Sequence, residues 1–562
     1  MPAALSQSTF PPLLAKRDHA ASATCYNKGT EAAARRAAGA REGRQAMNAG
    51  LREALDALRR AGQLDEVAEE IDLRYVSPLV ARSPHAILFR RVRGYEHGLV
   101  SGLLSDRRRL GICLGMEGAE TVDRLRQALD RPIAPVLVPD SPAKEIVLRG
   151  GDVDLSALPI PVMAELDGGP FIASAVVIAE HPRYGRNAGI YRLMLRNRNT
   201  LGIDIVSPNN LRALYQEAAA RGEPLPISIA VGAAPVELLA ATFKAPLELD
   251  EVGIAGGLRG EPVELVAGEC IPVAGLANAE IILEGELLPD GYVHPEGGYG
   301  EFTRLMGGVH RNPIVRVRAM TMRRDALFYA LQMPWENIYL SAPVYEAAAW
   351  RVLREAGVRT TAVNITPGGC CHWHVVAAIR KTPGDGKNAL TALLSVADFK
   401  HAIVTDDDID IYDPVEVEWA VATRVQADKD VLIISGSRGK PLDPSIPPGG
   451  NAGLTAKMGI DATIPDEVPR ARYTRITYPF RELLGADAPP APPFPAADGI
   501  ADTVGAAAAL REALAGRPLY YAELLARLRH VECRALNAAI GALDQAGDLS
   551  RDDQGRLQLA GG

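Results

Sequence analysis

Between Phe171 and Val317 the sequence is built from short β-branched segments, and this pattern constrains the fold more than any other feature of the chain. Three such segments are Ala173–Ala179, Ile227–Val231 and Ala279–Leu283, and glycine and proline residues separate them. Runs of roughly four to eight residues rich in valine and isoleucine, bounded by glycine and proline, are typical of strands. We therefore expect a middle domain that is mostly β-sheet.

After about Leu327 the pattern changes to alternating strands and helices. Ala347–Ala356 is a helix candidate, whereas Ala402–Thr405 and Val431–Ile434 are short apolar runs of the kind found in buried strands. Alternation of this kind is typical of a parallel α/β sheet. We expect this part of the chain to form one.

A helix is also predicted near the start of the chain. Leu51, Leu55 and Leu58 recur at intervals of three to four residues ahead of Leu64 and Val67, which predicts one apolar face. Short strands and helices are expected from Ala86 to about Asp152.

The first 46 residues are alanine-rich, carry seven Lys or Arg residues against three acids, and show little helical or strand periodicity. They stop just before a second methionine, Met47. Three interpretations are open: a disordered tail or upstream start that adds nothing to the fold, a targeting segment, and a docking arm. We favour the first of them.

The end of the chain has a pattern of its own, which follows the proline-rich run Pro489–Pro495, a stiff and extended linker. Residues 504–562 resemble a winged-helix module, with three helical patterns and a terminal hairpin. Seven Arg residues balance seven acids there, so packing or protein contact is favoured over DNA reading. The predicted elements are Ala507–Leu514, Tyr521–Leu528, Ala535–Gln545 and the hairpin Leu549–Leu559.

The composition favours an enzyme that acts on small molecules. A net charge of −8 and a pI near 5.8, with acids and bases mixed along the chain, argue against binding to nucleic acid or to anionic membranes. The six cysteines form no C-x-x-C pair, so reduced cytoplasmic thiols are the simplest interpretation. The chain has neither an apolar run of about 18–20 residues nor a secretory-type N-terminus. We expect a soluble, cytoplasmic protein.

The densest chemical signal is the segment His294–Thr303, which carries Glu296 and Glu301 among three glycines and a proline. These residues are incompatible with an ordinary helix, and the glycines predict a tight loop whose backbone lies close to another part of the protein. In a closed pocket, two nearby carboxyl groups have different pKa values and can serve as acid and base. The alternative is a glycine-rich surface loop with two solvated glutamates.

Two further clusters contain charged residues in unusual surroundings. Arg192, flanked by apolar residues within Gly185–Met194, is suited to bind a carboxylate or a phosphate, or it completes an ion pair in the core. The acidic segment Thr405–Asp413 is open to interpretation as a metal loop, a ribose-binding strand end or a solvated turn.

Taken together, these clusters resemble the UbiD family of decarboxylases. The resemblance extends from about Leu51 to Leu484, and the segments that carry it follow the order of the family. Besides the three clusters, the matching segments are Asp152–Pro161, Asp167–Pro170, Ala279–Gly285, Asp413–Trp419, Leu442–Ser445 and Lys457–Thr463.

The resemblance implies an α/β (α+β) multidomain fold whose β-rich middle domain is a split barrel. The expected division is a disordered tail over 1–46, an N-terminal α/β region over 47–165, the split barrel over 166–325, a C-terminal α/β oligomerisation domain over 326–485, a proline-rich linker over 486–503 and the winged-helix-like module over 504–562.

The resemblance further implies reversible, non-oxidative decarboxylation of an aromatic or α,β-unsaturated carboxylic acid, free or as a CoA thioester. The family uses prenylated FMN, which forms an adduct with the substrate and takes up electron density when CO2 leaves. By similarity, Glu301 is the proton donor, and Arg192 pairs with Glu296 and steers the substrate carboxylate. A non-catalytic scaffold or accessory subunit of a larger carboxylase is the alternative.

Cofactor, metal and substrate positions also carry over from the family. A divalent ion, usually Mn²⁺ with Mg²⁺ or Fe²⁺ as alternatives, maps to Asn187 and Glu251, with Asn210 where a histidine is common; K⁺ maps near Ala240 to Phe243. An amide oxygen is a chemically reasonable ligand for a hard cation. The cofactor positions are Asn187, Ala188, Gly189, Ile190, Tyr191, Arg192, Asn209, Asn210, Glu251 and Lys457, with Lys457 on the phosphate, and the substrate-pocket positions are Val206, Asn209 and Phe302.

The resemblance implies partners as well. A flavin prenyltransferase supplies the cofactor in this family, and members form dimers or hexamers through the C-terminal α/β domain, so a homo-oligomer is expected. The histidines of His372-Trp373-His374 look like a metal motif, but core packing or a pocket wall is favoured for them. Cys370 and Cys371 are interpreted as small buried residues.

Overall fold

The computed structural model describes residues 50–116, 118–440, 442–447, 453–479 and 499–561. The chain divides into two compact units, residues 1–465 and 466–562, and each is described by itself. The predicted tail over 1–46 and most of the predicted linker over 486–503 lie outside the described residues. Among the described residues, no helix is both long and apolar enough to span a membrane.

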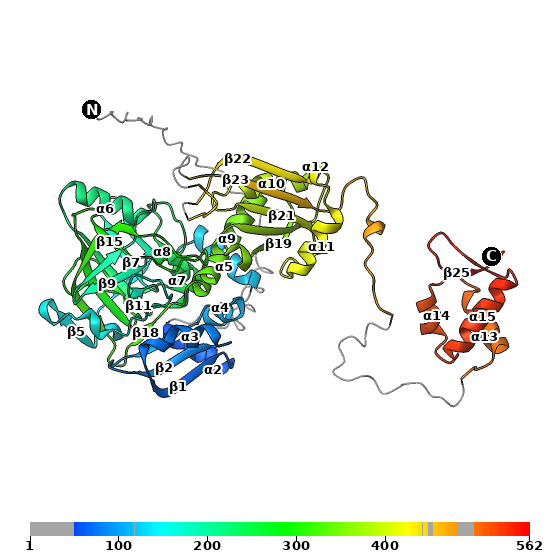
Figure 1. Ribbon diagram of the computed structural model, residues 1–562, viewed down its shortest axis with the longest axis horizontal. Helices are drawn as coiled ribbons and strands as arrows, with labels where there is room; N and C mark the ends of the chain where they lie inside the picture. Colours follow the sequence, from blue (N-terminus) through cyan, green and yellow to red (C-terminus); the bar gives the residue numbers. More distant parts are fainter. Residues whose placement is uncertain (1–49, 117, 441, 448–452, 480–498, 562) are drawn as a thin grey trace, which may run out of the picture. The chain divides into compact units, whose positions relative to one another are not determined.

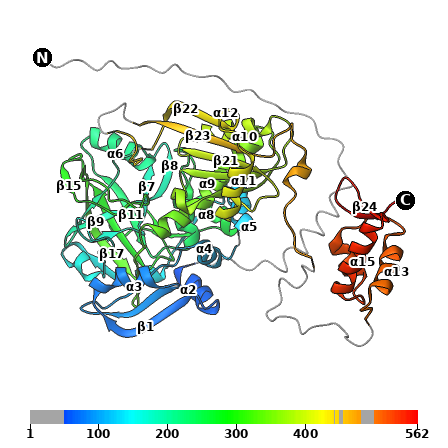
Figure 2. The same cartoon turned by 45° about the vertical axis from the view of Figure 1, so that its right-hand side comes forward.

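The first unit begins with the predicted helix, α2 (Leu51–Arg60), whose apolar face of Leu51, Leu55 and Leu58 is buried. Leu64 and Val67 do not extend this face. They lie in strand β1 (Leu64–Ile71) because the chain turns at Gly62, which has a φ of +64°. Figure 2 shows α2 and α3 (Val76–Arg82) beside this strand.

The N-terminal sheet has the order β1-β2-β3-β18, and β18 (Leu327–Tyr329) joins it from far along the chain. It pairs in parallel with β3, so strand pairing crosses the predicted boundary at residue 325. The other elements of this region are β2 (Ala86–Val92), β3 (Gly98–Ser101), η1 (Leu73–Tyr75), α3 (Val76–Arg82), α4 (Arg107–Leu114) and α5 (Gly118–Asp130).

The predicted β-rich middle is one large antiparallel sheet that curls into a half-barrel (Figure 1). Its strands run in the order β6-β9-β10-β17-β14-β11-β7-β8, and β5 pairs with β17 outside this path. Strand β8 therefore lies at one edge of the sheet. The strands are β5 (Ile146–Arg149), β6 (Phe171–Ile172), β7 (Val176–His181), β8 (Gly185–Ile190), β9 (Leu193–Asn197), β10 (Thr200–Ile203), β11 (Leu225–Val231), β14 (Ile281–Leu287) and β17 (Ile314–Met322).

Shorter elements surround this sheet. Two of them, β15 (His294–Glu296) and β16 (His310–Asn312), form a hairpin whose loop carries Glu301. The others are α6 (Asn210–Ala220), α7 (Pro235–Ala241), α8 (Glu251–Arg259), η2 (Pro142–Lys144), η3 (Gly150–Asp152), η4 (Leu155–Ala157), β4 (Val136–Val138), β12 (Glu264–Val266) and β13 (Gly275–Leu276).

The C-terminal part of the first unit is a five-stranded sheet with the order β19-β20-β21-β23-β22. The expectation of a parallel sheet holds for β20, β21 and β23, whereas both outer pairs, β19-β20 and β22-β23, are antiparallel. The elements are α9 (Trp335–Glu355), β19 (Thr360–Ile365), η5 (Pro367–Gly369), β20 (His374–Ile379), α10 (Asp385–Ser395), β21 (His401–Asp406), α11 (Pro414–Arg424), α12 (Ala427–Asp430), β22 (Val431–Arg438) and β23 (Leu454–Ala462).

Helices cover both faces of this C-terminal sheet. Val375 and Ala377 of β20 pack in one core with residues of α9 and α10, whereas Val376 and Ala378 pack on the opposite face with Val417 of α11. Successive side chains of a strand point to opposite faces, so a nearly continuous apolar strand is the expected pattern for a sheet covered on both sides.

The described residues of the second unit form a short 3-10 helix, three α-helices and a two-stranded hairpin, and the α-helices and the hairpin lie where the sequence predicts them. Helix α13 begins at Thr503 because Asp502 caps it, accepting a hydrogen bond from the Gly505 N–H at 2.8 Å. The winged-helix interpretation stays a prediction. The elements are η6 (Arg470–Tyr473), α13 (Thr503–Leu514), α14 (Tyr521–Arg527), α15 (Cys533–Gln545), β24 (Leu549–Arg551) and β25 (Leu557–Leu559).

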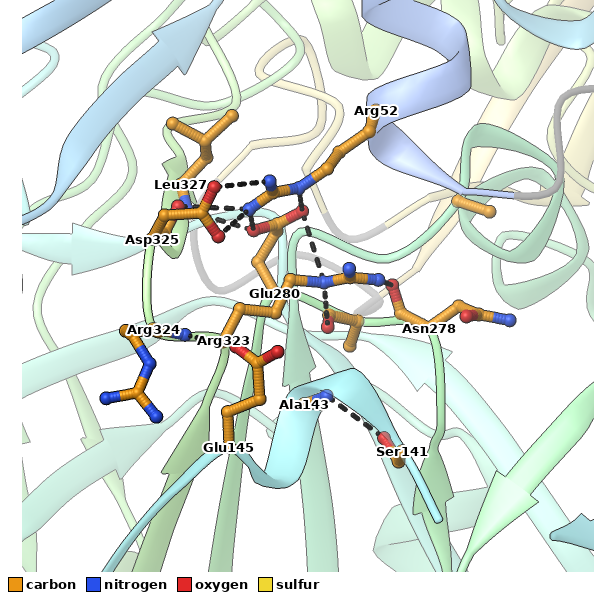
Figure 3. A network of polar contacts seen from close by, with 12 residues as sticks. Arg52, Ser141, Ala143, Glu145, Asn278, Glu280, Arg323, Arg324, Asp325 and Leu327 are labelled. Atoms are coloured by element: carbon orange, nitrogen blue, oxygen red, sulfur yellow. Dashed lines mark hydrogen bonds and ion pairs between the residues drawn. The ribbon is translucent and has the colours of Figure 1, made fainter.

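A polar network joins α2 to the middle sheet (Figure 3). Arg52 donates from Nε and Nη2 to the two carboxylate oxygens of Glu280, at 2.9 Å each, and also contacts Asp325. Glu280 is fully buried and accepts a third bond from the Leu327 N–H at 3.0 Å. Because Leu327 begins β18, this carboxylate links three separate segments of the chain.

We expect Arg52→Met to lower the free energy of unfolding by about 2 kcal/mol. Breaking a buried ion pair leaves a carboxylate without its partner, but Arg52 is partly exposed and Arg323 remains 3.5 Å from Glu280. Chemical denaturation followed by circular dichroism measures the change. The matched control is Arg60→Met, on the exposed end of the same helix; equal stability of the two variants would refute the role of the network.

Candidate active site

Arg192, Glu296 and Glu301 are in direct contact, although about 100 residues separate the arginine from the acids in sequence. Arg192 lies between β8 and β9, Glu296 ends β15, and Glu301 lies in the loop that follows. The Arg192 Nε is 3.3 Å from Glu296 Oε1, and its Nη1 donates to Glu301 Oε1. Glu296 is completely buried and Glu301 is 9% exposed. Three charged groups are thus gathered in a place that water barely reaches.

Asp204 is a third carboxylate on the same guanidinium, and sequence reasoning missed it. Its Oδ2 lies 2.5 Å from Arg192 Nη2. Strand pairing explains the contact, because Ile203 at the end of β10 pairs with Leu193 at the start of β9, so the residues that flank these two lie side by side. The available sequence signal was an acid directly after the strand segment Thr200–Ile203.

The electrostatics of this cluster favour a bound proton. Burial raises the pKa of both Glu296 and Glu301, and the Arg192 guanidinium opposes the shift in each case. Because one guanidinium cannot balance three carboxylates in a buried place, a proton on one carboxyl group lowers the energy of the cluster. The Tyr299 ring lies 4.9 Å below the guanidinium and completes its surroundings.

The glycines of the loop allow close backbone contacts, as the sequence predicted. A Cβ on Gly297 would lie 2.5 Å from the Cα of Gly168, and one on Gly307 would lie 2.9 Å from Glu301 Oε1. The Gly168 N–H also donates to the Gly298 carbonyl at 2.8 Å. The segment Asp167–Pro170 therefore holds the loop that carries Glu301 against the half-barrel.

Another glycine, Gly202 of β10, provides a direct test of the geometry. A Cβ there would stand 2.7 Å from Glu296 Oε2, so we expect Gly202→Ala to displace Glu296 from Arg192. The expected cost is about 1–3 kcal/mol of stability, with roughly tenfold or greater loss of kcat from a shift of a reacting group. Denaturant titration and steady-state kinetics measure the two effects.

The matched control for Gly202→Ala is Gly151→Ala, because a Cβ on Gly151 meets no atom within 4 Å. Unchanged kinetics in Gly202→Ala would mean that the position of Glu296 does not matter for the chemistry of this site.

A cavity of about 390 Å³ opens beside the cluster. All three predicted pocket residues, Val206, Asn209 and Phe302, line it. Asn209 is held in place because it caps α6, accepting a hydrogen bond from the Arg212 N–H at 2.8 Å. The other lining residues are Ala173, Ile190, Tyr191, Arg192, Asp204, Ser207, Tyr299, Glu301, His310, Met333, Asn337 and Leu442.

The predicted cation ligands Asn187 and Glu251 also touch, although they do not line the cavity. The Asn187 Nδ2 donates to Glu251 Oε1 at 3.1 Å, and the Ala188 N–H donates to Glu251 Oε2 at 2.8 Å. The Asn187 Oδ1 is buried without a hydrogen-bond partner, and burial raises the pKa of Glu251 to about 7. A divalent cation would satisfy both the amide oxygen and the carboxylate, so these residues fit the predicted ion.

The other positions predicted to bind the cations and the cofactor phosphate make contacts only with backbone carbonyls or lie near them. The Asn210 side chain donates to the Ala245 carbonyl at 3.1 Å. The segment from Ala240 to Phe243 contains the last two residues of α7 and the two that follow, a place where helix carbonyls attract cations. Lys457 is buried in β23 and donates to two carbonyls, those of Leu394 and Val396, at 2.8 and 2.6 Å. It does not line the cavity, and its contact with a phosphate remains a prediction.

Two motifs that the sequence left open have structural roles. His372 is buried between the rings of Phe302 and Tyr345, at centroid distances of 4.2 and 4.6 Å. In the acidic segment, Asp408 pairs with the buried Arg424 at 2.6 Å, and Asp413 caps α11. In the part of the chain that the structure describes, no group of three or more His, Cys, Asp or Glu side chains could hold a metal ion.

Comparison with known families gives three matches that follow one another along the chain. Residues 55–129, 136–334 and 338–462 match the N-terminal, Rift-related and C-terminal domains, respectively, of the 3-octaprenyl-4-hydroxybenzoate carboxy-lyase UbiD. Together these matches cover well over half of the sequence.

Individual relatives agree with this assignment. The chain is 36% identical over 383 residues to the anhydromevalonate phosphate decarboxylase of Methanothermobacter thermautotrophicus, covering 67% of this chain and 88% of the relative. It is 29% identical over 428 residues to the gallate decarboxylase of Lactiplantibacillus plantarum, covering 70% of this chain and 87% of the relative.

Solved structures are similar as well. The UbiD-class enzyme HmfF from Pelotomaculum thermopropionicum, in complex with FMN, has a TM-score of 0.73 and 38% identity, over 76% of this chain and 97% of HmfF. An evolved dimeric form of HmfF in complex with prenylated FMN has a TM-score of 0.70 and 35% identity, over 77% of this chain and 97% of that form of HmfF.

Proposed function

The chain belongs to the UbiD family of carboxy-lyases, and from this premise we propose that it catalyses the reversible, non-oxidative decarboxylation of an aromatic or α,β-unsaturated carboxylic acid. The observation that carries the proposal is the contact of Arg192 with Glu296 and Glu301 at the wall of one cavity. A purely structural ion pair would not need three carboxylates on one guanidinium beside an open space.

Each group in the cluster has a distinct task in this proposal. Glu301 lines the cavity and burial raises its pKa, so it keeps its proton to higher pH than an exposed glutamate and delivers it to the carbon that has lost CO2. Arg192 favours the ionised form of Glu296 and directs the substrate carboxylate by its charge. The near absence of solvent around these side chains strengthens their interactions.

The proposed cofactor is prenylated FMN, which would supply a sink for the electron pair that stays on the substrate carbon when CO2 leaves. The backbone offers a suitable place for it, because β8 is an edge strand whose outer N–H and C=O groups are not paired with another strand. Ile190 and Tyr191, at the end of this strand, line the cavity. The complexes of HmfF with FMN and prenylated FMN support this choice.

A divalent ion, preferably Mn²⁺, is proposed to bind to Asn187, Glu251 and Asn210. A K⁺ ion is proposed near the end of α7. The walls of the cavity suit a flat conjugated acid, since they include the Phe302 and Tyr299 rings and the side chains of Val206 and Ile190. We further propose that the protein is cytoplasmic and forms a homo-oligomer. The evolved dimeric form of HmfF supports the proposal of a homo-oligomer.

The test is an assay of CO2 release by protein produced together with a flavin prenyltransferase. The panel contains acrylic, hydroxybenzoic and heteroaromatic acids, free and as CoA thioesters. We expect release from at least one of them, and incorporation of labelled bicarbonate into the same acid. A flavin-loaded protein that releases no CO2 and exchanges no bicarbonate with any of them would refute the proposed function.

A further inference from the structure

His310 is a cavity residue that the proposed chemistry leaves without a task. It begins β16, directly opposite Glu296 on β15, and its side chain is 35% exposed. Its Nδ1 lies 3.5 Å from Asp204 Oδ2, and this nitrogen is buried without a hydrogen-bond partner. The imidazole thus extends from the buried acid cluster toward solvent.

Decarboxylation creates a need for such a group. When R–COO⁻ and H⁺ give R–H and CO2, the C–C bond breaks, a C–H bond forms, and one proton is consumed in every turnover. In the proposed function this proton comes from Glu301, which is left as a carboxylate. Because Glu301 is 9% exposed, it needs a route for a new proton before the next substrate reacts.

We propose that His310 supplies this route, taking a proton from solvent and passing it to Glu301 across the cavity that both side chains line. The inference rests on the proposed function and deepens it. Histidine suits the task because its imidazole gains and loses a proton within the physiological pH range. His310 is also one of the charges that act on Glu301.

The charges that face His310 favour transfer toward the acids. They are Asp204 after β10, Glu296 on the paired strand, Glu301 in the hairpin loop, and Arg192 beyond them. After product formation the ionised Glu301 adds a second negative charge nearby, so the proton moves to the group that needs it.

Pre-steady-state kinetics of the cofactor-loaded enzyme tests the proposal. We expect His310→Asn to complete its first turnover at the wild-type rate, because Glu301 already carries a proton, and then to slow by about 100-fold. Product formation should show a burst of about one equivalent per site, absent from the wild type. Added imidazole should restore the later turnovers, and His310→Gln should behave in the same way.

The matched control is His181→Gln, since His181 is another imidazole beside a carboxylate, Glu217 at 3.1 Å, but is more buried than His310 and lies outside the cavity. It should turn over as the wild type does. Three results would overturn the proposal: an unchanged steady state in His310→Asn, equal slowing of first and later turnovers, or a rise in KM alone. A wild type that releases no CO2 from any acid would instead refute the proposed function itself.

Discussion

Replacing Glu301 with glutamine is expected to lower kcat by about 1000-fold while leaving the fold intact. The amide has the shape of the protonated carboxyl group, but it cannot give a proton to the substrate carbon. A positioned acid contributes roughly 10²–10⁴-fold to a rate, and Glu301 is the only carboxyl group of the predicted acid pair that lines the cavity in the described part of the chain. Steady-state CO2 release by the cofactor-loaded variant measures the loss.

The control for Glu301→Gln is Glu286→Gln, which should keep full activity. Glu286 of β14 forms a solvent-facing ion pair with Arg318 of the neighbouring strand β17. The pH dependence gives a second check. Because burial raises the pKa of Glu301, its proton persists to higher pH than usual, and wild-type kcat should fall as the pH rises through that pKa. A variant with undiminished kcat would remove Glu301 from the mechanism.

Arg192→Met is expected to abolish measurable activity and to lower the free energy of unfolding by about 3–5 kcal/mol at neutral pH. Removing one partner of a buried ion pair leaves its carboxylates uncompensated, and here Asp204, Glu296 and Glu301 all lose the same cation. The pKa values of Glu296 and Glu301, which burial already raises, then rise further in the folded protein.

The sign of the pH effect follows from proton binding. Groups with a raised pKa bind more protons when folded than when unfolded, so the stability of Arg192→Met should fall as the pH rises from about 5.5 to 8. Denaturant titration at both pH values measures this, with Arg198→Met, in an exposed pair with Asp154, as the control. Identical pH dependence in Arg192→Met and wild type would contradict the account of the cluster.

The elements of the fold were predictable where the pattern is local. The segment Ile227–Val231 lies within β11, and the helices and hairpin of the last 60 residues lie where their periodicity indicates. Strand direction was not predictable for β22, because a chain leaving a helix can pair with either orientation and nothing in Val431–Ile434 selects one. The pairing of β18 with β3 also depends on contacts more than 200 residues apart.

The candidate site was predictable to a similar extent. Arg192, Glu296 and Glu301 stand out because charged residues among apolar or glycine-rich neighbours are unusual. Asp204 and His310 were missed because each is an ordinary polar residue next to or within a short strand: Asp204 follows β10 and His310 begins β16. Only the pairing of β10 with β9 and of β16 with β15 brings them to the cluster. Local sequence does not contain that pairing.

The most direct test of the central claim is an experimental structure of the protein loaded with prenylated FMN. We expect the flavin ring in the cavity lined by Ile190, Tyr191 and Phe302, with Arg192 and Glu301 at its reactive face and the phosphate beside the cation held by Asn187 and Glu251. A flavin bound elsewhere, or a ring that faces away from Glu301, would contradict the account.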